Sequence, residues 1–584
     1  MREESLHIKR SPYLINKAFS GFLVAAILAT ASSNLAVIID GIIVGRLLGA
    51  SQLAAINLTM PLMQFIFTLV LLVSVGSSML AARAIGGGRA SVANHYFSGA
   101  LLLGAALGIV LIGVGAVATD TVSSVLCSEE GLRPLVGAYL KPILLFAPIY
   151  LLLPILCTMM RIDGAAKLTA TAMIVANVVN ISFDFILISG LGMGIEGSSL
   201  ATTIGNAVGI AVVLSHFIRK RNSIRFVRPR LKEIDIKKST VLGLPMAIVS
   251  ALLTVKLIIV NSIILDLEGA QGASYLAVSM SLMMLVSLFV GGVVQTIQPI
   301  GSMLLGQKDS GGLRLLISKA IGVLVLCVAL IVGVIEAVPA LFAQFFGITS
   351  TEVIGDAVVA IRLVTLSFLP FAVNYLLIVI YQLSGRSTLS IATSITQPML
   401  VVVVMLIVSA VAPELVWWSF IISEMAVLTA LYLISVVKSS GKVRLDRLTM
   451  LERTKESHSL DFSVEVSAPG AVATALGELD RFFEEEGCNP ISANKIRLSA
   501  EELLLNIIAH GFKDTKRHFV DLRTHITDEC ITLTLKDDGR AFNPALEAAS
   551  DKGLGLKIVQ GVTPNIEYKY IFFQNTTKIT IENN

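Results

Sequence analysis

The stretch LAAINLTMPLMQFIFTLVLLVSVGSSML, residues 53–80, contains no charged side chain. An α-helix of roughly 20 apolar residues crosses the ~30 Å hydrocarbon core of a bilayer, so this stretch predicts a membrane-spanning helix. It decides the fold because comparable stretches recur along the first three quarters of the chain. They lie at 17–40, 93–118, 133–159, 166–189, 197–218, 239–265, 273–304, 315–338, 354–383, 388–411 and 414–437. The sequence therefore predicts a polytopic α-helical membrane protein with twelve transmembrane helices.

The composition of the whole chain supports this prediction. Hydrophobic residues make up 55% of the 584 residues and charged residues only 15%, and the mean hydropathy is +0.81. A wholly soluble protein of this length cannot bury so much apolar surface. The first apolar segment lacks a small-residue cleavage site and is followed by eleven more, so we interpret it as the first span rather than a removable signal peptide.

Positive charges cluster in every second gap between the apolar stretches. By the positive-inside rule these gaps and both termini are predicted to be cytoplasmic. The alternate gaps are mainly acidic, with Arg46 and Arg133 as exceptions. The net charge of +4 comes largely from the basic loops, and it indicates contact with anionic membrane lipid rather than nucleic acid. The basic gaps hold Arg2, Lys9, Arg10, Lys17, Arg83, Arg89, Arg161, Lys167, nine residues between Arg219 and Lys238, Lys308, Arg314 and Arg386.

The five cysteines are far apart and form no CxxC pair, so neither a zinc site nor a disulfide framework is predicted.

An internal repeat divides the spans into two halves. Leu53-Ala54-Ala55 reappears as Leu276-Ala277-Val278, and Pro148 pairs with Pro370 at nearly the same offset. The repeat predicts two six-helix lobes, at about 11–218 and 239–437, joined by the basic loop. Because each lobe has an even number of spans, both enter the membrane from the same side, with a candidate pathway between them.

Polar residues within the predicted spans mark a candidate ion site. Asp40 ends the first span, and Asn177, Asn180 and Asp184 lie on one face of the fifth. Ser199, Thr202 and Asn206 have the same spacing in the sixth span. Carboxylate, amide and hydroxyl oxygens suit H+ or Na+, whereas the simpler alternative is that the amides and hydroxyls only hold helices together. The position opposite Asp40 in the second half is apolar Ile263, so no matching acid is predicted there.

Three motifs resemble the multidrug and toxic compound extrusion (MATE) family. They are DGIIVGRLLGASQLAA at 40–55, RIDGAAK at 161–167 and GMGIEGSSLAT at 192–202. The resemblance, over about residues 11–437, implies a V-shaped pair of six-helix lobes that exports organic molecules, often cationic, against an H+ or Na+ gradient. It also implies a cation site at Asp40, Asn180, Asp184 and Thr202. Lys256, inside the seventh span, departs from many relatives; it could pair with a carboxylate, snorkel or disfavour cationic substrates.

The charge density rises abruptly after Val437. Residues 438–460 are predicted to be a polar linker, and 461–584 a soluble α/β sandwich with a mostly antiparallel sheet. We expect strands at 460–468, 518–526, 530–537, 566–574 and 577–582, and helices at 471–487, 491–511 and 554–562.

The tail carries a candidate nucleotide site. The chain has no GxxxxGK[ST] sequence, which excludes a P-loop and with it an ABC-type pump. Instead, ELLLNIIAHG at 502–511 places Glu502, Asn506 and His510 on one helical face. Asn506 suits a hydrated Mg2+ beside phosphates, and Glu502 is placed as a base. The remaining candidates are Asp537 for the adenine amino group and Gly539, Gly553 and Gly555 for a backbone approach to phosphate.

These tail motifs resemble the GHKL (Bergerat-fold) ATPases, and within them the anti-sigma-factor serine kinases. The resemblance implies that Asn506 holds Mg2+ with ATP, Glu502 is the catalytic base, Asp537 reads adenine and the three glycines line the phosphate pocket. Ala541 departs from the broader D-x-G-x-G pattern in a way that the serine-kinase branch tolerates. No histidine-bearing helix pair precedes the domain, which disfavours an autophosphorylating histidine kinase.

Three hypotheses follow for the whole chain. The leading one is an H+- or Na+-coupled exporter of small organic or xenobiotic molecules in a bacterial inner (plasma) membrane, with a cytoplasmic ATP-binding, kinase-like regulatory tail. In the second, the membrane part is a receptor that signals by phosphorylating a partner, such as an anti-sigma antagonist. In the third, the membrane part is a lipid-linked oligosaccharide flippase. The sequence names neither the substrate nor the coupling ion.

Overall fold

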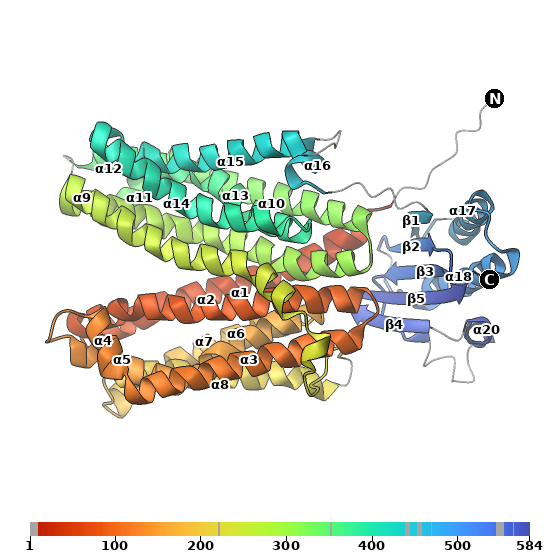
Figure 1. The fold of residues 1–584 in the computed structure, drawn as a ribbon, viewed down its shortest axis with the longest axis horizontal. Coiled ribbons are helices and arrows are strands. Elements are labelled where there is room, and N and C mark those ends of the chain that lie inside the picture. The colour runs from red at the N-terminus through yellow and green to blue at the C-terminus, as the bar shows by residue number, and fades with distance from the viewer. Residues whose placement is uncertain are drawn as a thin grey trace. The chain divides into compact units, whose positions relative to one another are not determined.

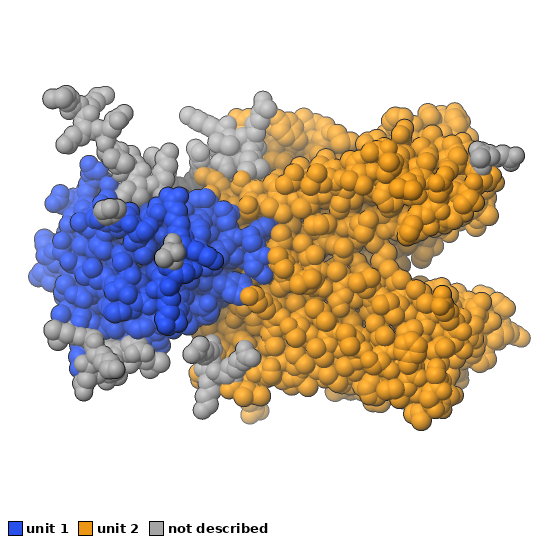
Figure 2. Space-filling view, turned by 180° about the vertical axis from the view of Figure 1, so that it is seen from behind, with its two compact units in different colours: residues 1–21, 453–584 blue, residues 22–452 orange. Residues whose placement is uncertain are grey.

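The computed structural model of the chain describes residues 10–583 except 220–221, 351–352, 439–443, 452–457, 469, 515, 545–553 and 564–565. The chain forms two compact units (Figure 2). We call residues 22–452 the membrane unit. Residues 1–21 group with 453–584, and we call this second body the tail unit. Gly553 and parts of the predicted linker lie outside the described residues.

The membrane unit is built from helices (Figure 1). In the described part of the chain, ten helices are long and apolar enough to cross a membrane, or eleven if one bent pair counts as a span. The prediction of a polytopic helical membrane protein is therefore confirmed. The helices are α1 (Tyr13–Leu47), α2 (Ala50–Gly86), α3 (Ala90–Val117), α4 (Thr119–Leu126), α5 (Arg133–Leu145), α6 (Ala147–Ile162), α7 (Ala166–Asp184), α8 (Ile195–Leu214), α9 (Ile236–Gly306), α10 (Ser310–Ala337), α11 (Pro339–Phe345), α12 (Ile354–Leu366), α13 (Phe368–Leu383), α14 (Ser387–Val411), α15 (Trp418–Lys438) and α16 (Arg444–Thr449).

Two helix breaks account for the differences from the predicted spans. The stretch 133–159 is not one straight helix, because α5 and α6 meet at an angle of 57°. Pro148 lies in the first turn of α6, where its missing N–H is tolerated but continuation of the preceding helix is not. Conversely, α9 runs through both predicted spans 239–265 and 273–304. Its one non-helical residue, Gly269 at φ 64°, lies in the gap predicted between them.

Glycines bring α2 and α9 into direct backbone contact. A Cβ atom on Gly76 would overlap the carbonyl of Ser239, and one on Gly306 would overlap the carbonyl of Arg83. Small residues let transmembrane backbones approach closely, which is how helices gain van der Waals contact where no hydrophobic drive operates between them. These glycines therefore join the first and second halves of the membrane unit.

The predicted polar linker is partly helical. Within its described residues, α16 packs against α13, because the Tyr381 hydroxyl donates to the Leu448 carbonyl at 3.1 Å and Ser384 donates to the Thr449 carbonyl at 3.0 Å.

The tail unit contains a five-stranded antiparallel sheet in the order β1-β2-β3-β5-β4. Its apolar residues, such as Leu522 and Ile579, pack with Leu503 and Leu504 in one core. The helices α17, α18 and α20 lie beside the strands (Figure 1). The elements are β1 (Ser459–Glu465), α17 (Ala471–Glu485), α18 (Pro490–His510), β2 (Phe519–Ile526), β3 (Cys530–Asp537), α20 (Leu554–Val562), β4 (Ile566–Ile571) and β5 (Gln574–Glu582).

The order and type of the predicted tail elements are confirmed, but the last hairpin was placed too late. We expected one strand to run to 574, whereas β4 ends at Ile571 and β5 begins at Gln574. The two turn residues, Phe572 and Phe573, have φ of 58° and 62°. A two-residue hairpin turn of type I′ has positive φ at both positions, and phenylalanine rarely signals such a turn.

Candidate functional sites

The structure places the four predicted ion-site residues on three helices of the membrane unit. Asp40 lies on α1, Asn180 and Asp184 lie on α7, and Thr202 lies on α8. Asp184 is the last α-helical residue of α7, and the π-helical segment η1 (Phe185–Gly190) follows it. A π-helical turn inside a span often marks a functional site, since it redirects side chains and backbone groups.

Hydrogen bonds tie three of these residues to their neighbours. Ser198 donates to the Asp40 carboxylate at 3.1 Å. Asn180 donates to the Thr202 hydroxyl at 2.8 Å, and that hydroxyl donates to the Ser198 carbonyl at 3.2 Å. Asn177, also predicted for this face, instead donates to Ser32 on α1 at 2.9 Å. These contacts connect α1, α7 and α8 around the predicted site.

Asp184 differs from the others because its carboxylate lacks donors. The residue is 0% exposed, and neither side-chain oxygen has a hydrogen-bond partner among the described residues. Its carboxyl group lies close enough to the Asp40 carboxyl group and the Ser198 hydroxyl to interact with both, although neither contact has hydrogen-bond geometry. Two neighbouring carboxyl groups in a dry environment need a shared proton or a bound cation. The two carboxyl groups therefore fit the H+ or Na+ site that the sequence predicts.

No group of three or more His, Cys, Asp or Glu residues suitable for a metal occurs in the described ranges. Any bound Na+ would therefore need hydroxyl and amide oxygens beside the two carboxylates.

A second polar cluster, in the other half of the membrane unit, was missed by the sequence analysis. Glu424 on α15 is 2% exposed and accepts hydrogen bonds from Asn374 and Gln397. The repeat was used only to look for an acid opposite Asp40, where the second half has Ile263. Glu424 lies 222 positions after Thr202, the offset that also separates Pro148 from Pro370, so the repeat itself was the available signal.

The predicted nucleotide-site residues of α18 lie in the tail unit. Asn506 donates to the carbonyl of Glu502, one turn earlier, at 2.7 Å. This bond uses the amide nitrogen, and the amide oxygen has no hydrogen-bond donor in the described part of the chain. His510 is exposed at the last position of α18. An amide oxygen held in this way fits the Mg2+ ligand that the resemblance implies.

Asp537, at the end of β3, is buried and already holds two donors. The Gly539 N–H and the Asn575 side chain each bind its Oδ1 at 2.8 Å. Burial raises the pKa of Asp537 to about 6, and these two hydrogen bonds oppose the rise. Asn575 comes from β5 and could not be found by local motif analysis, since the sheet alone brings it to Asp537. The second oxygen of the carboxylate is available for an adenine amino group.

Two predicted glycines have no room for a side chain. A Cβ atom on Gly555 would overlap the Glu502 carboxylate, and one on Gly539 would lie 2.7 Å from the Gly511 carbonyl. These close approaches bring the start of α20 to Glu502 and the turn after β3 to Gly511, just past the end of α18. Gly555 and Gly539 therefore both lie beside the C-terminal half of α18 or the residue that follows it.

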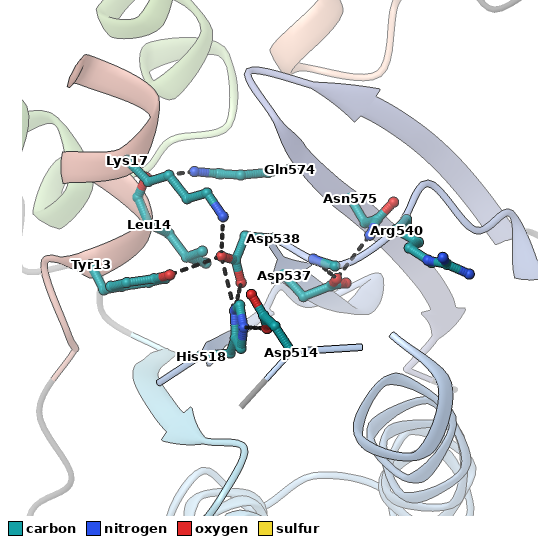
Figure 3. Close-up of polar contacts among 11 residues, drawn as sticks. Tyr13, Leu14, Lys17, Asp514, His518, Asp537, Asp538, Arg540, Gln574 and Asn575 are labelled. Atoms are coloured by element: carbon teal, nitrogen blue, oxygen red, sulfur yellow. Dashed lines mark hydrogen bonds and ion pairs between the residues drawn. The ribbon is translucent and has the colours of Figure 1, made fainter. Parts of the chain in front are cut away.

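Asp538, beside Asp537, is bound by residues from the start of α1 (Figure 3). The Tyr13 hydroxyl donates to it at 3.0 Å, and Lys17 forms an ion pair with it. His518 lies 3.1 Å from its other oxygen and 2.6 Å from Asp514. All of these residues belong to the tail unit, so residues 13–21 of the first helix are bound to the strand that carries the adenine candidate.

The fold and the two sites define a membrane protein of transporter type joined to an ATP-binding domain. Residues 25–186 match the MatE family, and residues 466–581 match the histidine kinase-like ATPase domain. The chain thus carries a MATE domain with a C-terminal GHKL-type ATPase domain, as predicted.

Curated relatives and solved structures agree with the first of these domains. The chain is 24% identical over 460 residues to the multidrug export protein MepA of Staphylococcus saprophyticus, covering 77% of this chain and all of MepA. MepA of Staphylococcus aureus is 24% identical over 461 residues, covering 77% and 98%. A MOP superfamily transporter from Pyrococcus furiosus, described as having a binding pocket of reverse polarity, shares the fold with a TM-score of 0.66 at 20% identity, covering 76% and 100%. An outward-facing multidrug resistance MATE transporter gives a TM-score of 0.67 at 20% identity, with the same coverage.

Proposed function

We propose that this protein is a secondary active exporter of small organic or xenobiotic molecules, driven by an H+ or Na+ gradient. The observation that carries the proposal is the buried Asp184 carboxylate, which has no hydrogen-bond donor and faces the Asp40 carboxyl group. In lipid, such an acid needs a proton or cation to remain stable, and its release would leave a charge that the protein must compensate. Asn180 and Thr202 would supply the further oxygens.

The proposal assigns twelve spans in two lobes, with both termini in the cytoplasm. It counts α5 with α6 as one span and divides α9 at Gly269. The surface of the membrane unit is hollowed between two arms (Figure 2), which supports a pathway between the lobes. The clustering of Lys and Arg supports the orientation.

The tail would bind ATP with Mg2+ and regulate transport. Asn506 and His510 would face the bound nucleotide, Asp537 would accept from adenine, and Gly539, Gly553 and Gly555 would approach the phosphates. Regulation is supported by α1, because this single helix carries both Lys17, paired with Asp538, and Asp40 of the ion site. ATP binding next to Asp538 would then alter the anchoring of α1.

Phosphorylation of a partner protein is a second output that the site permits. Glu502 lies against Gly555 at the start of α20, where a base could take a proton from a serine hydroxyl. An anti-sigma antagonist is the class of partner implied by the resemblance.

Counterflow in proteoliposomes tests the proposal directly. We expect gradient-dependent uptake of members of a compound panel by the full chain under an imposed Na+ or H+ gradient, with ATP changing the rate. Asp120→Asn is a matched control, because Asp120 is an exposed carboxylate on α4. Uptake by the wild-type protein that depends on neither gradient would contradict secondary export. It would favour the receptor or the flippase hypothesis.

Removing residues 455–584 separates the two domains. The truncated chain should insert and export, because each unit has its own core. Loss of export by a normally inserted truncation would make the tail part of the transport cycle rather than a regulator.

A further inference from the structure

The second half of the membrane unit contains a partly open cavity of about 340 Å³. Both parts of α9 line it, together with α12, α13 and α15. Small-molecule sites are usually apolar cavities of at least ~300 Å³ with a few placed polar groups. The cavity is thus large enough for a small organic molecule.

Most of the cavity wall is apolar and much of it is aromatic. The aromatic side chains are those of Phe368, Phe371, Tyr375 and Phe420. Met280 and Met283 add flexible thioether side chains. Such a wall favours a flat or aromatic molecular body, since ring faces and edges pack against it at little entropic cost.

Glu424 also lines the cavity, but its carboxylate is already occupied by protein donors. Asn374 donates to one oxygen at 2.9 Å, and Gln397 donates to the other at 2.8 Å. Both amides are 0% exposed. These two donors fix the orientation of the carboxylate, and Lys256 also attracts it from beyond 4.0 Å.

Lys256, the remaining charged residue of the lining, lacks such partners. Its ammonium group lies 5.9 Å from the centre of the Phe371 ring. No carboxylate lies within 4.0 Å of it and it has no hydrogen-bond acceptor in the part of the chain that the structure describes, although Glu424 attracts it from further away. A cation in an apolar wall is costly unless an anion pairs with it. The cavity therefore presents one cation without a close anion, beside open space.

We propose that this cavity binds small substrates with an aromatic body and a single carboxylate group, which pairs with Lys256. The inference rests on the proposed export function and names its substrate class. The aromatic body lies between Phe371 and Phe420, and the substrate carboxylate supplies the anion that Lys256 lacks. Cationic substrates are excluded from this cavity because Lys256 repels them while Glu424 is already held by two amides.

Equilibrium binding to the purified full chain tests the proposal without transport. The probes are 1-naphthaleneacetate, its neutral amide 1-naphthaleneacetamide and the cation 2-(1-naphthyl)ethylamine. We expect the carboxylate to bind at least about tenfold more tightly than either analogue, as the loss of a desolvated charge pair implies. Lys256→Met should remove this preference, Lys256→Arg should keep most of it, and Lys141→Met, at an exposed lysine of α5, should leave it unchanged.

Lys256→Met places an apolar side chain in an apolar wall, so its thermal unfolding midpoint should equal or exceed that of the wild-type protein. Equal affinity for the three probes, or an unchanged preference in folded Lys256→Met protein, would overturn the proposal. A failure of this binding proposal can be distinguished from a failure of the proposed export function. Asp184→Asn should lose gradient-driven uptake yet retain naphthaleneacetate binding, whereas gradient-driven uptake of amines without selective carboxylate binding would reject only the cavity assignment.

Discussion

Two buried aspartates, one in each unit, have opposite surroundings. Asp184 in the membrane unit has no donor to either oxygen, whereas Asp537 in the tail unit accepts from the Gly539 N–H and from Asn575. Both side chains are almost fully buried. An acid without donors can remain buried only with a proton or a cation, while an acid with fixed donors is oriented to receive one more. This difference is the reason for proposing exchange of an ion at Asp184 and recognition of a neutral donor at Asp537.

Glu424 allows the same comparison within the membrane unit. Its two amide donors make it resemble Asp537 rather than Asp184. Burial of an acid at membrane depth is thus insufficient to identify a coupling site. The presence or absence of local donors distinguishes the two cases.

The largest expected effect is on coupling through Asp184. Asp184→Asn keeps the shape of the side chain but removes its ability to take up and release a proton or bind a cation. Gradient-driven uptake should fall to the level of protein-free vesicles, and Asp40→Asn should do the same. Both variants should express and insert normally. Undiminished uptake in both, beside Asp120→Asn as control, would remove the ion site from the first half.

Substitution of Asp537 should weaken ATP binding by roughly tenfold or more, the scale of a lost charged hydrogen bond. Asp537→Asn retains the size of the side chain but replaces an acceptor oxygen with a donor. Isothermal titration of the full chain with ATP and Mg2+ measures the change. A normal affinity in this variant would mean that adenine is read elsewhere.

The pH dependence of ATP binding is a second test of the role of the Asp537 carboxylate. Burial raises the pKa of Asp537 to about 6, so the carboxylate is charged above pH 6 and protonated below it. Affinity should therefore fall as the pH drops from 7.5 to 5, and this step should be absent in Asp537→Asn. A raised pKa means that the folded tail binds the proton more tightly than the unfolded chain does, so this group favours folding at low pH and its contribution is lost as the pH rises through 6. Unfolding through Asp537 cannot explain the predicted loss of binding.

Removing the carboxylate of Glu424 should affect stability more than coupling. Glu424→Ala leaves the buried Gln397 amide without an acceptor, at a cost of about 1–3 kcal/mol, whereas the Asn374 amide keeps its hydrogen bond to the Glu424 backbone carbonyl at 2.9 Å. Glu424→Gln, which keeps one acceptor oxygen, should cost less. Thermal unfolding in detergent compares the two variants. Complete loss of gradient-driven uptake in well-folded Glu424→Gln would assign an ion site to the second half as well.

How much of this could be read from the sequence depended on the range of the interactions. Apolar runs predict helices, and strand and helix periodicity in the tail is local, so these elements were predicted well. The bend between α5 and α6 was not, because the apolar pattern continues past Pro148, whereas the non-helical Gly269 of α9 lies in the predicted gap between 265 and 273. The turn at Phe572 and Phe573 was missed because its backbone conformation is unusual for these residues.

The site residues show the same limit. Asp40, Asp184 and Asn506 stand out as polar or motif residues, but their partners come from distant parts of the chain. Asn575 reaches Asp537 only through the pairing of β3 with β5. The donors to Glu424 come from α13 and α14, and no spacing within one helix could have shown them.

The smallest expected effect concerns the anchoring of α1 to the tail. Lys17 pairs with Asp538, but the lysine side chain is 41% exposed while the Asp538 side chain is 0% exposed. Solvent screens an ion pair with one exposed partner, so Lys17→Met should change stability by less than ~1 kcal/mol. ATP affinity should be nearly unchanged, because Tyr13 and His518 still hold Asp538. If α1 transmits the state of the tail, the variant should nevertheless reduce the effect of ATP on the uptake rate. Uptake assays with and without ATP, using Lys141→Met as the matched control, measure this ratio. An ATP effect identical to that of the wild-type protein would show that Lys17 does not contribute to regulation, and that the tail acts through other contacts.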